Sequence, residues 1–537
     1  MDAQRVTRRS MLRAFGAVAG LTAASMLAAC NVPTATPPTP KPAEPAKPAA
    51  APAAKPAEQK PAAQPAAPAA QPAATKPAEA AKPAAPAPAV SQAAPAKTAG
   101  SGFKWDRFKG AQVRMIWTDL KPVIGGLQPH FAEFEELTGI KLVYEGYATA
   151  QHRQKMTIEL VAKEPGLDSY GMQVSQQGRL HWESGWIEPL DKYIDDKELT
   201  NPEWDFDDFG AGARSANQIP SEGATIKSVA LATAQCQVMY YREDLLKEAG
   251  IQPPKTHQEL MDAAKALNQP DKGHHGIVLR GGGKWATTQI GTYLYAMGGR
   301  WIGDDGRLAI DTPEMGKTLE YYGGLIREYG PPGVSNFDDR AVAASFQQGQ
   351  AAIMTDLNHF QLVFNDPAQS PKTAGKVRVA YIPRGPVEGP VPGGHFIMLP
   401  VQNVAMSPYS KNKEATWLWL QWLTSKQSFV RRQLAGNSSP RVSTWKDQEF
   451  LGTPTAQTNP DWVELSVGAN QYGRNWVSPP ILAVDEFRDI MAKAIDAVVL
   501  GQGSLDTVLK EVQQESDDLM GRTEPAGKKV VDWSKLR

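Results

Sequence analysis

Three short patterns in this sequence contain residue types that could do chemistry, but each lacks the partners that the chemistry needs. Residues 281–284 are GGGK, without the spacing or the following Ser or Thr of a phosphate-binding loop. Ser410 and Lys413 match the S-x-x-K of some serine hydrolases, but the accompanying motifs are missing and Ser favours capping of the helix that follows. His274 and His275 have no partners at metal-ligand spacing. The sequence therefore predicts a protein that is not an enzyme, with no metal and no cofactor.

Cys30 indicates a different chemistry, the attachment of a lipid. Arg8 and Arg9 precede an apolar run that ends in Leu-Ala-Ala-Cys at 27–30 and is too short to span a membrane. The arginine pair resembles the twin-arginine export signal, although Met11 stands where that motif prefers Phe. The last four residues resemble a lipobox, in which Cys30 becomes the lipidated N-terminus. Residues 1–29 are thus predicted to be a signal peptide, the alternative being a buried helix with a chance arginine pair.

Residues 30–100 predict a lipidated cysteine followed by a disordered spacer. The segment consists almost entirely of Pro, Ala, Lys, Gln and Glu, so it has too few large apolar side chains to bury a core. Frequent proline favours polyproline II, at ~3.1 Å per residue. The spacer would hold the folded part away from the membrane.

The composition of the whole chain limits the classes of protein that it can belong to. The chain has 537 residues, 42% of them hydrophobic, which is enough for more than one domain. It carries 57 basic and 57 acidic side chains, a balance that argues against a nucleic-acid partner. Cys236 is the only other cysteine, so a lipidated Cys30 leaves no possible intramolecular disulfide. Cys236 is predicted to be a small buried residue.

Residues from 103 onward have the pattern of an α/β protein. A β-rich run at 111–120 is followed by apolar residues at helical spacing over 131–138 and a second strand at 140–146. This strand–helix–strand order indicates a parallel sheet. Near the end of the chain, 486–501 and 504–520 are predicted to form two amphipathic helices.

The stretch at 240–267 has the sequence YYREDLLKEAGIQPPKTHQELMDAAKAL. A strand feeds a short helix, which Gly250 ends in a left-handed conformation and which two prolines prevent from continuing. Thr256 and Glu259 form a capping box that starts the next helix.

This stretch resembles the extracellular solute-binding proteins of ABC importers, family 1, the group of maltose-binding protein. Further segments match in family order: SGWIEPLDKYID, SFQQGQAAIMT, GGHFIMLPVQNVAMSPYSKNKEATWLWLQWLTS, GNSSPRVS and AIDAVVLGQGSLDTVLKEV. Together they cover residues 113–520. A lipid anchor and spacer fit the resemblance, because many of these proteins are tethered lipoproteins.

The resemblance implies a periplasmic-binding-protein type II fold, with two separately cored α/β lobes, an interlobe cleft and crossover hinge strands. The N-terminal lobe would comprise 101–231 and 397–465, the C-terminal lobe 232–396 and 466–525, and residues 526–537 a tail. ATAQCQ at 232–237 and PVPGGHFIM at 390–398 would be the crossings. Gly393 and Gly394 suit a hinge, although an ordinary loop explains them equally well.

The implied cleft places ligand-binding residues just after strands, because open α/β sheets bind ligands beyond the carboxyl ends of their strands. Gln235 would lie in the first crossing, where maltose-binding protein has an acid, which indicates a different ligand. The other predicted binding residues are Trp117, Asp119, Lys121, Ser175, Gln176, Trp285, Asp356, Asn358, His359, Phe360, Tyr472, Arg474 and Trp476.

This mixture favours a carbohydrate, whose C–H faces stack on aromatic rings while its hydroxyls bind amides and carboxylates. Trp417, Trp419 and Trp422 are instead predicted to be core residues of a helix. The predicted function is capture of a sugar or oligosaccharide by hinge closure and delivery to ABC permease subunits, by a monomer outside the cytoplasm. A binding protein for a peptide or polyamine, a secreted glycoside hydrolase and a signalling receptor are the alternatives.

Overall fold

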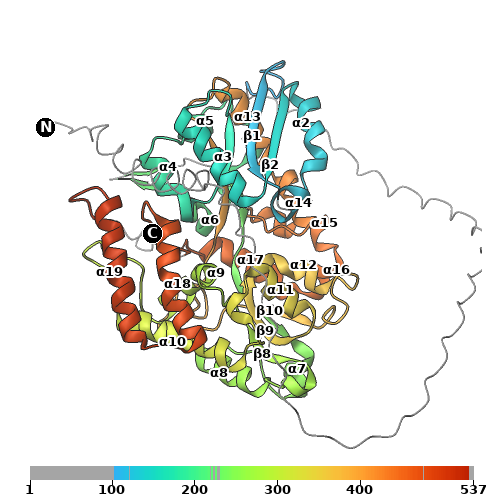
Figure 1. The fold of residues 1–537 in the computed structure, drawn as a ribbon. Helices are drawn as coiled ribbons and strands as arrows, with labels where there is room; N and C mark the ends of the chain where they lie inside the picture. The colour runs from blue at the N-terminus through green and yellow to red at the C-terminus, as the bar shows by residue number, and fades with distance from the viewer. Residues whose placement is uncertain are drawn as a thin grey trace, which may run out of the picture. The chain divides into compact units, whose positions relative to one another are not determined.

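The computed structural model describes residues 102–530 apart from residues 120, 218, 222–223, 227–229 and 476. Within these residues the chain forms two lobes, each built around a β-sheet (Figure 1). The predicted signal peptide, Cys30, the predicted spacer and residues 531–537 of the predicted tail lie outside the described residues.

The sheet of the N-terminal lobe has five strands in the order β2-β1-β3-β11-β6. They are β1 (Gln112–Thr118), β2 (Lys141–Tyr147), β3 (Ser169–Met172), β6 (Ala230–Ala234) and β11 (Val401–Met406). β1 pairs in parallel with β2 and β3, whereas β11 is antiparallel to both β3 and β6. The parallel pairing predicted from the strand–helix–strand order is confirmed for β1 and β2. The antiparallel strand β11 was not predicted; it enters this sheet from the other lobe and not through a crossover helix.

The sheet of the C-terminal lobe has four strands in the order β10-β7-β9-β8. They are β7 (Gln237–Arg242), β8 (His275–Val278), β9 (Ala351–Leu357) and β10 (Val377–Ala380). β7 is antiparallel to β9 and β10, and β8 is parallel to β9. A separate two-stranded hairpin pairs β4 (Ile219–Ser221) with β5 (Ala224–Ile226).

Tryptophan packing attaches the helices of the N-terminal lobe to its sheet. Trp417 and Trp419 on α13 are fully buried and Trp422 nearly so, which confirms their prediction as core residues. The Trp419 ring lies 5.1 Å from that of Phe134 on α2. The helices here are α2 (Phe131–Thr138), α3 (Thr149–Ala162), α4 (Arg179–Glu183), α5 (Asp191–Ile194), α6 (Ala211–Ala216), α13 (Lys413–Leu423), α14 (Lys426–Leu434), α15 (Gln448–Leu451) and α16 (Pro454–Thr458), with π-helical turns η1 (Lys121–Gly125) and η3 (Val174–Gly178).

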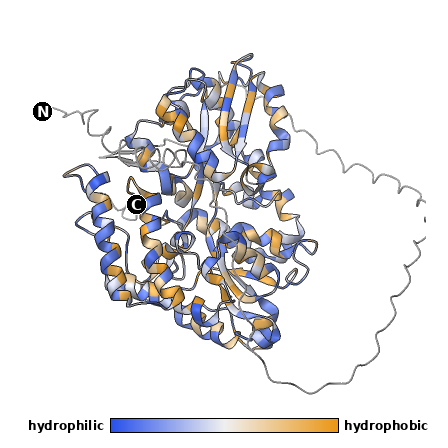
Figure 2. Ribbon diagram, in the orientation of Figure 1, coloured by the Kyte–Doolittle hydropathy of each residue, from blue (hydrophilic) through white to orange (hydrophobic). Residues whose placement is uncertain are grey.

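The helices of the C-terminal lobe begin and end largely where the sequence predicts. Gly250 adopts φ of +69° after α7, and Thr256 Oγ1 accepts the Glu259 N–H at 3.2 Å to cap α8. Buried apolar residues recur every three or four positions along α18 (Val484–Leu500) and α19 (Leu505–Thr523), with polar residues between them (Figure 2). The helices are α7 (Glu243–Glu248), α8 (His257–Ala266), α9 (Gly283–Ala296), α10 (Pro313–Tyr329), α11 (Asp339–Gln347), α12 (Gln361–Asn365), α17 (Pro460–Tyr472), α18 (Val484–Leu500) and α19 (Leu505–Thr523).

The apolar cores of the two lobes are continuous with each other. One cluster of buried side chains includes residues of both sheets, and it contains Cys236, Ile397 and Leu399 from the connections between them. The expectation of two separately closed cores was therefore wrong, because the connections are themselves apolar and buried. Cys236 is buried as predicted.

A close approach between Gly171 on β3 and Trp117 on β1 generates a prediction about stability. A Cβ atom at Gly171 would lie 1.6 Å from Trp117 Cδ1, and the indole is only 1% exposed and cannot move into solvent. We expect Gly171→Ala to lower the free energy of unfolding by about 1–3 kcal/mol or more, measured by urea denaturation.

Gly324→Ala is the matched control, because apart from its own stretch of helix α10 no atom lies within 4 Å of the place that its added methyl group would take. It should be neutral or stabilising by about 0.5–1 kcal/mol. Equal stability of the two variants would contradict the packing of Trp117 on Gly171.

Candidate ligand-binding site

The strand directions place the carboxyl ends of most strands of both sheets near the connection between the lobes. β1, β2 and β3 are parallel, and β6 has the same direction as β3, so these strands end at the edge where β6 leaves for the other lobe. Only Gln235 and Cys236 separate β6 from β7. In the second sheet β8, β9 and β10 also end at the edge where β7 begins. Loops after six strands in two lobes therefore gather at the connection between the lobes.

Backbone hydrogen bonds hold the connecting stretches together. The N–H of Gln235 donates to Pro400 O at 3.0 Å, and that of Gln237 donates to Met398 O at 3.1 Å. A third stretch joins them, since the Leu399 N–H donates to Arg474 O at 2.8 Å. We call residues 235–236, 397–400 and 473–475 the crossing segments.

Gly393 and Gly394 come shortly before the second crossing segment. Their φ values of +88° and +80° place both in the left-handed region, in a turn in which the Gly394 N–H donates to Val391 O. Their role as a hinge stays a prediction, as do the lobe boundaries.

In the N-terminal lobe the predicted residues differ in accessibility. Asp119 is exposed directly after β1, whereas Trp117 is buried over Gly171, a position that favours packing over ligand contact. Ser175 lies in η3 and its buried hydroxyl has no hydrogen-bond partner among the described residues. Gln176 beside it accepts a hydrogen bond from Arg153 Nη2. Lys121 lies in η1, and its side chain is not among those described.

The predicted residues after β9 divide into anchors and open groups. Asn358 is an anchor with three hydrogen bonds. Its backbone carbonyl accepts a hydrogen bond from the Trp462 indole, and its side-chain amide donates to Ser466 Oγ at 3.0 Å. Its side-chain oxygen accepts the Cys236 N–H, so Asn358 joins the first crossing segment to α17. The His359 ring packs against that of Phe360 at an interplanar angle of 36°, with centroids 4.1 Å apart, and its Nδ1 has no partner within the described residues. Burial lowers the pKa of His359 to about 4, so the ring is neutral at pH 7 and offers one donor and one acceptor.

Asp356 is fully buried in an ion pair with Arg280, a residue that the sequence analysis missed. Arg280 Nε and Nη2 lie 2.8 and 2.5 Å from its two carboxylate oxygens, and Gln289 donates to one of them at 3.0 Å. Burial raises the pKa of Asp356, and the guanidinium opposes that effect. With its oxygens engaged, Asp356 is placed to hold the loop after β8 against the end of β9. Only the tertiary structure pairs these residues, because they are 76 positions apart.

Two exposed aromatic residues come from the loop after β8 and from the end of α17. Trp285 is 48% exposed in the first turn of α9 and Tyr472 is 39% exposed. Arg474 donates to the carbonyls of Tyr472 and Gly473, has no carboxylate partner among the described residues, and has its pKa lowered by burial. Gln235 is buried in the first crossing segment. Trp476 lies outside the described residues.

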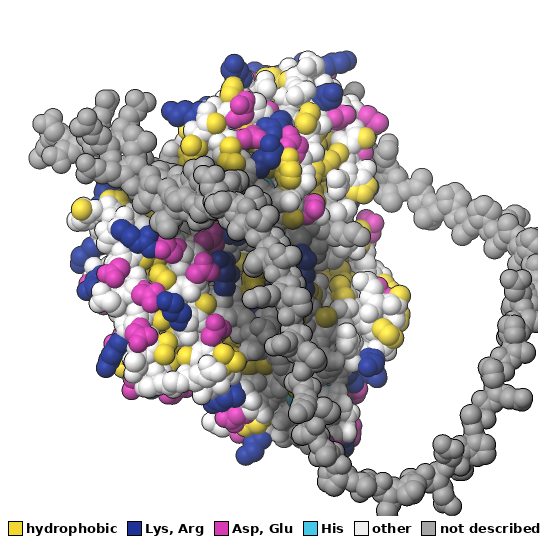
Figure 3. Space-filling view, in the orientation of Figure 1, with side chains coloured by type: hydrophobic (Ala, Val, Ile, Leu, Met, Phe, Trp, Pro, Cys, Tyr) yellow, Lys and Arg dark blue, Asp and Glu magenta, His cyan; other side chains and the backbone are white. Residues whose placement is uncertain are grey.

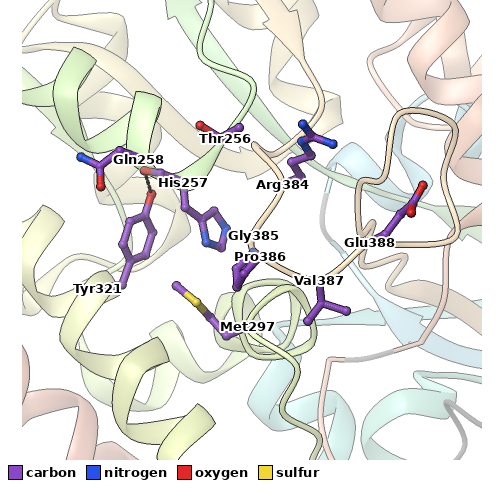
Figure 4. A pocket seen from close by; sticks show the side chains of 10 residues that line it. All are labelled: Thr256, His257, Gln258, Met297, Tyr321, Arg384, Gly385, Pro386, Val387 and Glu388. Atoms are coloured by element: carbon purple, nitrogen blue, oxygen red, sulfur yellow. Dashed lines mark hydrogen bonds between the residues drawn. The ribbon is translucent and has the colours of Figure 1, made fainter.

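A cavity of about 650 Å³ lies in the C-terminal lobe, away from the crossing segments (Figure 4). It is bounded by the start of α8, Met297, Tyr321 of α10 and residues 384–388, and Tyr321 donates a hydrogen bond to the His257 carbonyl. No residue predicted to bind ligand lines it. All of its lining residues come from one lobe, so a ligand bound there would not bridge the two lobes.

Other kinds of site find little support in the described part of the chain. No group of three or more His, Cys, Asp or Glu residues there could hold a metal ion. None of the helices there is both long and apolar enough to cross a membrane. On the face shown in Figure 3, acidic and basic side chains are interspersed.

Comparison with known proteins now decides the family. The model of the bacterial extracellular solute-binding protein family matches residues 118–428, more than half of the chain. The chain belongs to this family. As a solute-binding protein it has two α/β lobes, in agreement with the fold that the sequence analysis expected.

Relatives of this solute-binding protein are named for polyols. It is 27% identical to the mannitol-binding protein of Pseudomonas aeruginosa over 69% of this chain and 84% of that protein. It is 25% identical to the erythritol/L-threitol-binding protein of Mycolicibacterium smegmatis over 62% of this chain and 70% of that one. A solute-binding protein of Agrobacterium radiobacter K84, solved with ribitol, superposes with a TM-score of 0.66 at 27% identity, covering 76% of this chain and 99% of that one.

The Arg280–Asp356 pair yields a prediction that separates anchoring from ligand contact. Asp356→Asn leaves the buried guanidinium without its counter-charge, so we expect the free energy of unfolding to fall by about 3–5 kcal/mol without any ligand, measured by urea denaturation. Glu515→Gln, in the exposed pair with Lys493, is the control and should cost less than about 1 kcal/mol. A stable Asp356→Asn protein would show that the carboxylate is not an anchor.

Proposed function

We propose that this solute-binding protein captures a small polyol or sugar between its lobes and delivers it, chemically unchanged, to an ABC permease. The observation that carries the proposal is the convergence of strand ends from both lobes on the crossing segments. Ser175, His359 and the exposed Trp285 lie in the segments that directly follow those ends, and the exposed Tyr472 ends α17 beside the third crossing segment. The names of the relatives support the ligand class.

The side chains suit a ligand with many hydroxyl groups. A polyol donates and accepts at each hydroxyl, and its C–H groups pack on aromatic faces. Ser175, Gln176, Gln235 and His359 provide neutral donors and acceptors, and Asp119 an exposed carboxylate. Trp285, Phe360 and Tyr472 are the proposed aromatic contacts, with Arg474, Lys121 and Trp476 as further candidates. Trp117, Asp356 and Asn358 would act from behind, by packing or holding the binding loops.

Binding would work by stabilising a closed arrangement of the lobes. A solute that touches both lobes favours the closed state, and only its differential affinity for that state can shift the equilibrium. Rotation would take place at the short crossing segments, with Gly393 and Gly394 as candidate hinge residues. Proton transfer and bond cleavage have no part in this function.

Export and anchoring complete the proposal. Residues 1–29 would direct export by the twin-arginine route, Cys30 would carry the lipid, and residues 31–100 would form the tether. The protein would act as a monomer beside its permease outside the cytoplasmic membrane.

A thermal-shift panel tests the ligand class. With mannitol, ribitol or erythritol at about 100 times the dissociation constant, the full chain should gain about 2.7 kcal/mol of stability, seen as a higher Tm. Maltose, a tripeptide and spermidine complete the panel. A response to the tripeptide or spermidine alone, or hydrolysis of a glycoside, would overturn the proposal.

The same assay identifies the aromatic contact. Trp285→Ala should weaken binding of the active polyol by about threefold to tenfold, since a stacking contact contributes about 0.5–1.5 kcal/mol. Trp105→Ala is the control, because Trp105 precedes β1 and so lies at the amino-end edge of that sheet.

Metabolic labelling tests the anchor. Wild-type cells should incorporate labelled palmitate into the protein, and Cys30→Ala should abolish labelling and move the protein from the membrane to the soluble fraction. The double substitution Arg8→Lys and Arg9→Lys should block export. Membrane-bound, unlabelled Cys30→Ala protein would contradict the lipid anchor.

A further inference from the structure

Two arginines of the N-terminal lobe make ion pairs with carboxylates of the C-terminal lobe. Arg153 on α3 has its Nη1 3.2 Å from both carboxylate oxygens of Asp485, in the first turn of α18. Arg179 at the start of α4 has its Nη2 2.6 Å from Glu524, the residue that follows α19. Arg153 and Asp485 are 332 positions apart, and Arg179 and Glu524 are 524 − 179 = 345 positions apart, so the pairs form only because the lobes meet here.

The Arg179 contact is the more enclosed of the two. The side chains of Arg179 and Glu524 are 14% and 6% exposed, and Arg179 Nη1 also donates to Pro480 O at 2.8 Å. The other carboxylate oxygen of Glu524 accepts the Leu482 N–H at 2.8 Å. Arg179 is therefore held by the end of α19 and by the segment that leads into α18.

The Arg153 contact connects to residues proposed to bind the ligand. Arg153 Nη2 donates to Gln176 of the N-terminal lobe while Nη1 pairs with Asp485. One turn along α18 from Asp485, Arg488 donates to Lys284 O at 3.0 Å, and its guanidinium lies 6.0 Å from the Trp285 ring centroid. The first turns of α18 thus contact both the N-terminal lobe and the loop that presents Trp285.

We infer that Arg153–Asp485 and Arg179–Glu524 form an interlobe latch that favours the closed arrangement of the lobes and positions Gln176 and Trp285 in it. The link to ligand affinity rests on the proposed function, whereas the effect on lobe closure does not. Separation of the lobes breaks both pairs, because each joins residues of different lobes. The Arg153–Asp485 pair is partly exposed, so salt should weaken it.

Electron–electron distance measurements on the full chain test the latch without any ligand. Spin labels at Val161→Cys on α3 and Leu500→Cys on α18, introduced together with Cys30→Ala, report lobe separation, since both positions are about half exposed and Cys236 is buried. Arg153→Glu should shift the distances to longer values, and Arg153→Glu with Asp485→Arg should restore the wild-type distribution. The neutral variant Arg153→Gln should lengthen the label distances less than Arg153→Glu does. Added salt should no longer change the distances in Arg153→Gln.

Ligand affinity provides the second readout. Arg153→Glu should raise the Kd of the polyol by about threefold to tenfold because a smaller fraction of molecules is closed, and the double reversal should restore it. Arg107→Glu is the control, because the Arg107–Glu198 pair at 3.2 Å lies within the N-terminal lobe and should leave distances and Kd unchanged. Distances unaffected by Arg153→Glu, or not restored by the double reversal, would overturn the latch.

The two proposals fail in different ways. If the charge reversal opens the lobes but no polyol binds any variant, the latch stands and the ligand assignment falls. For the second pair, Arg179→Glu should also lengthen the label distances. Should that variant fail to fold because its site is enclosed, Glu524→Gln keeps the hydrogen bond from Arg179 to Pro480 O, removes the charge of the pair and should lengthen the distances less. Distances unchanged in both variants would remove Arg179–Glu524 from the latch.

Discussion

The structure depends on the passage of the chain between two sheets within very few residues. β6 ends in one sheet and β7 begins in the other after only Gln235 and Cys236, so the two sheet edges must face each other. Backbone hydrogen bonds from Gln235 and Gln237 to the second crossing segment fix this arrangement. Because the strands concerned end at the crossing, loops from both lobes meet there, and the proposed binding site lies among these loops.

The buried carboxylate of Asp356 at the end of β9 is stabilised by the side chains around it. A carboxylate with no exposure is unfavourable unless it is paired and hydrogen-bonded, and Arg280 and Gln289 together meet that requirement for Asp356. The pair joins the loop that carries Trp285 to the strand that leads to Asn358 and His359. Rigid support beneath a few open polar groups limits the entropy that a small solute must remove on binding.

Family membership and the local chemistry both support the proposed capture of a polyol or sugar. The relatives are named for linear polyols, and the candidate site offers neutral donors and acceptors with exposed rings at its margin. The interlobe ion pairs would contribute to the free energy of lobe closure even without a ligand. Binding of the ligand would then add a second, separate contribution. A latch of this kind would raise affinity by increasing the fraction of closed protein.

The sequence by itself determined the local elements and the family. Gly250, Thr256 and Glu259 fixed the boundaries of α7 and α8, because caps act through neighbouring residues. Helical spacing placed Trp417 and Trp419 in the core. Only the tertiary structure decided that β11 is antiparallel, that the cores are continuous, and that Arg280 meets Asp356 and Arg153 meets Asp485. Each of these depends on contacts between residues far apart in the chain, and residue type and spacing carry no information about such contacts.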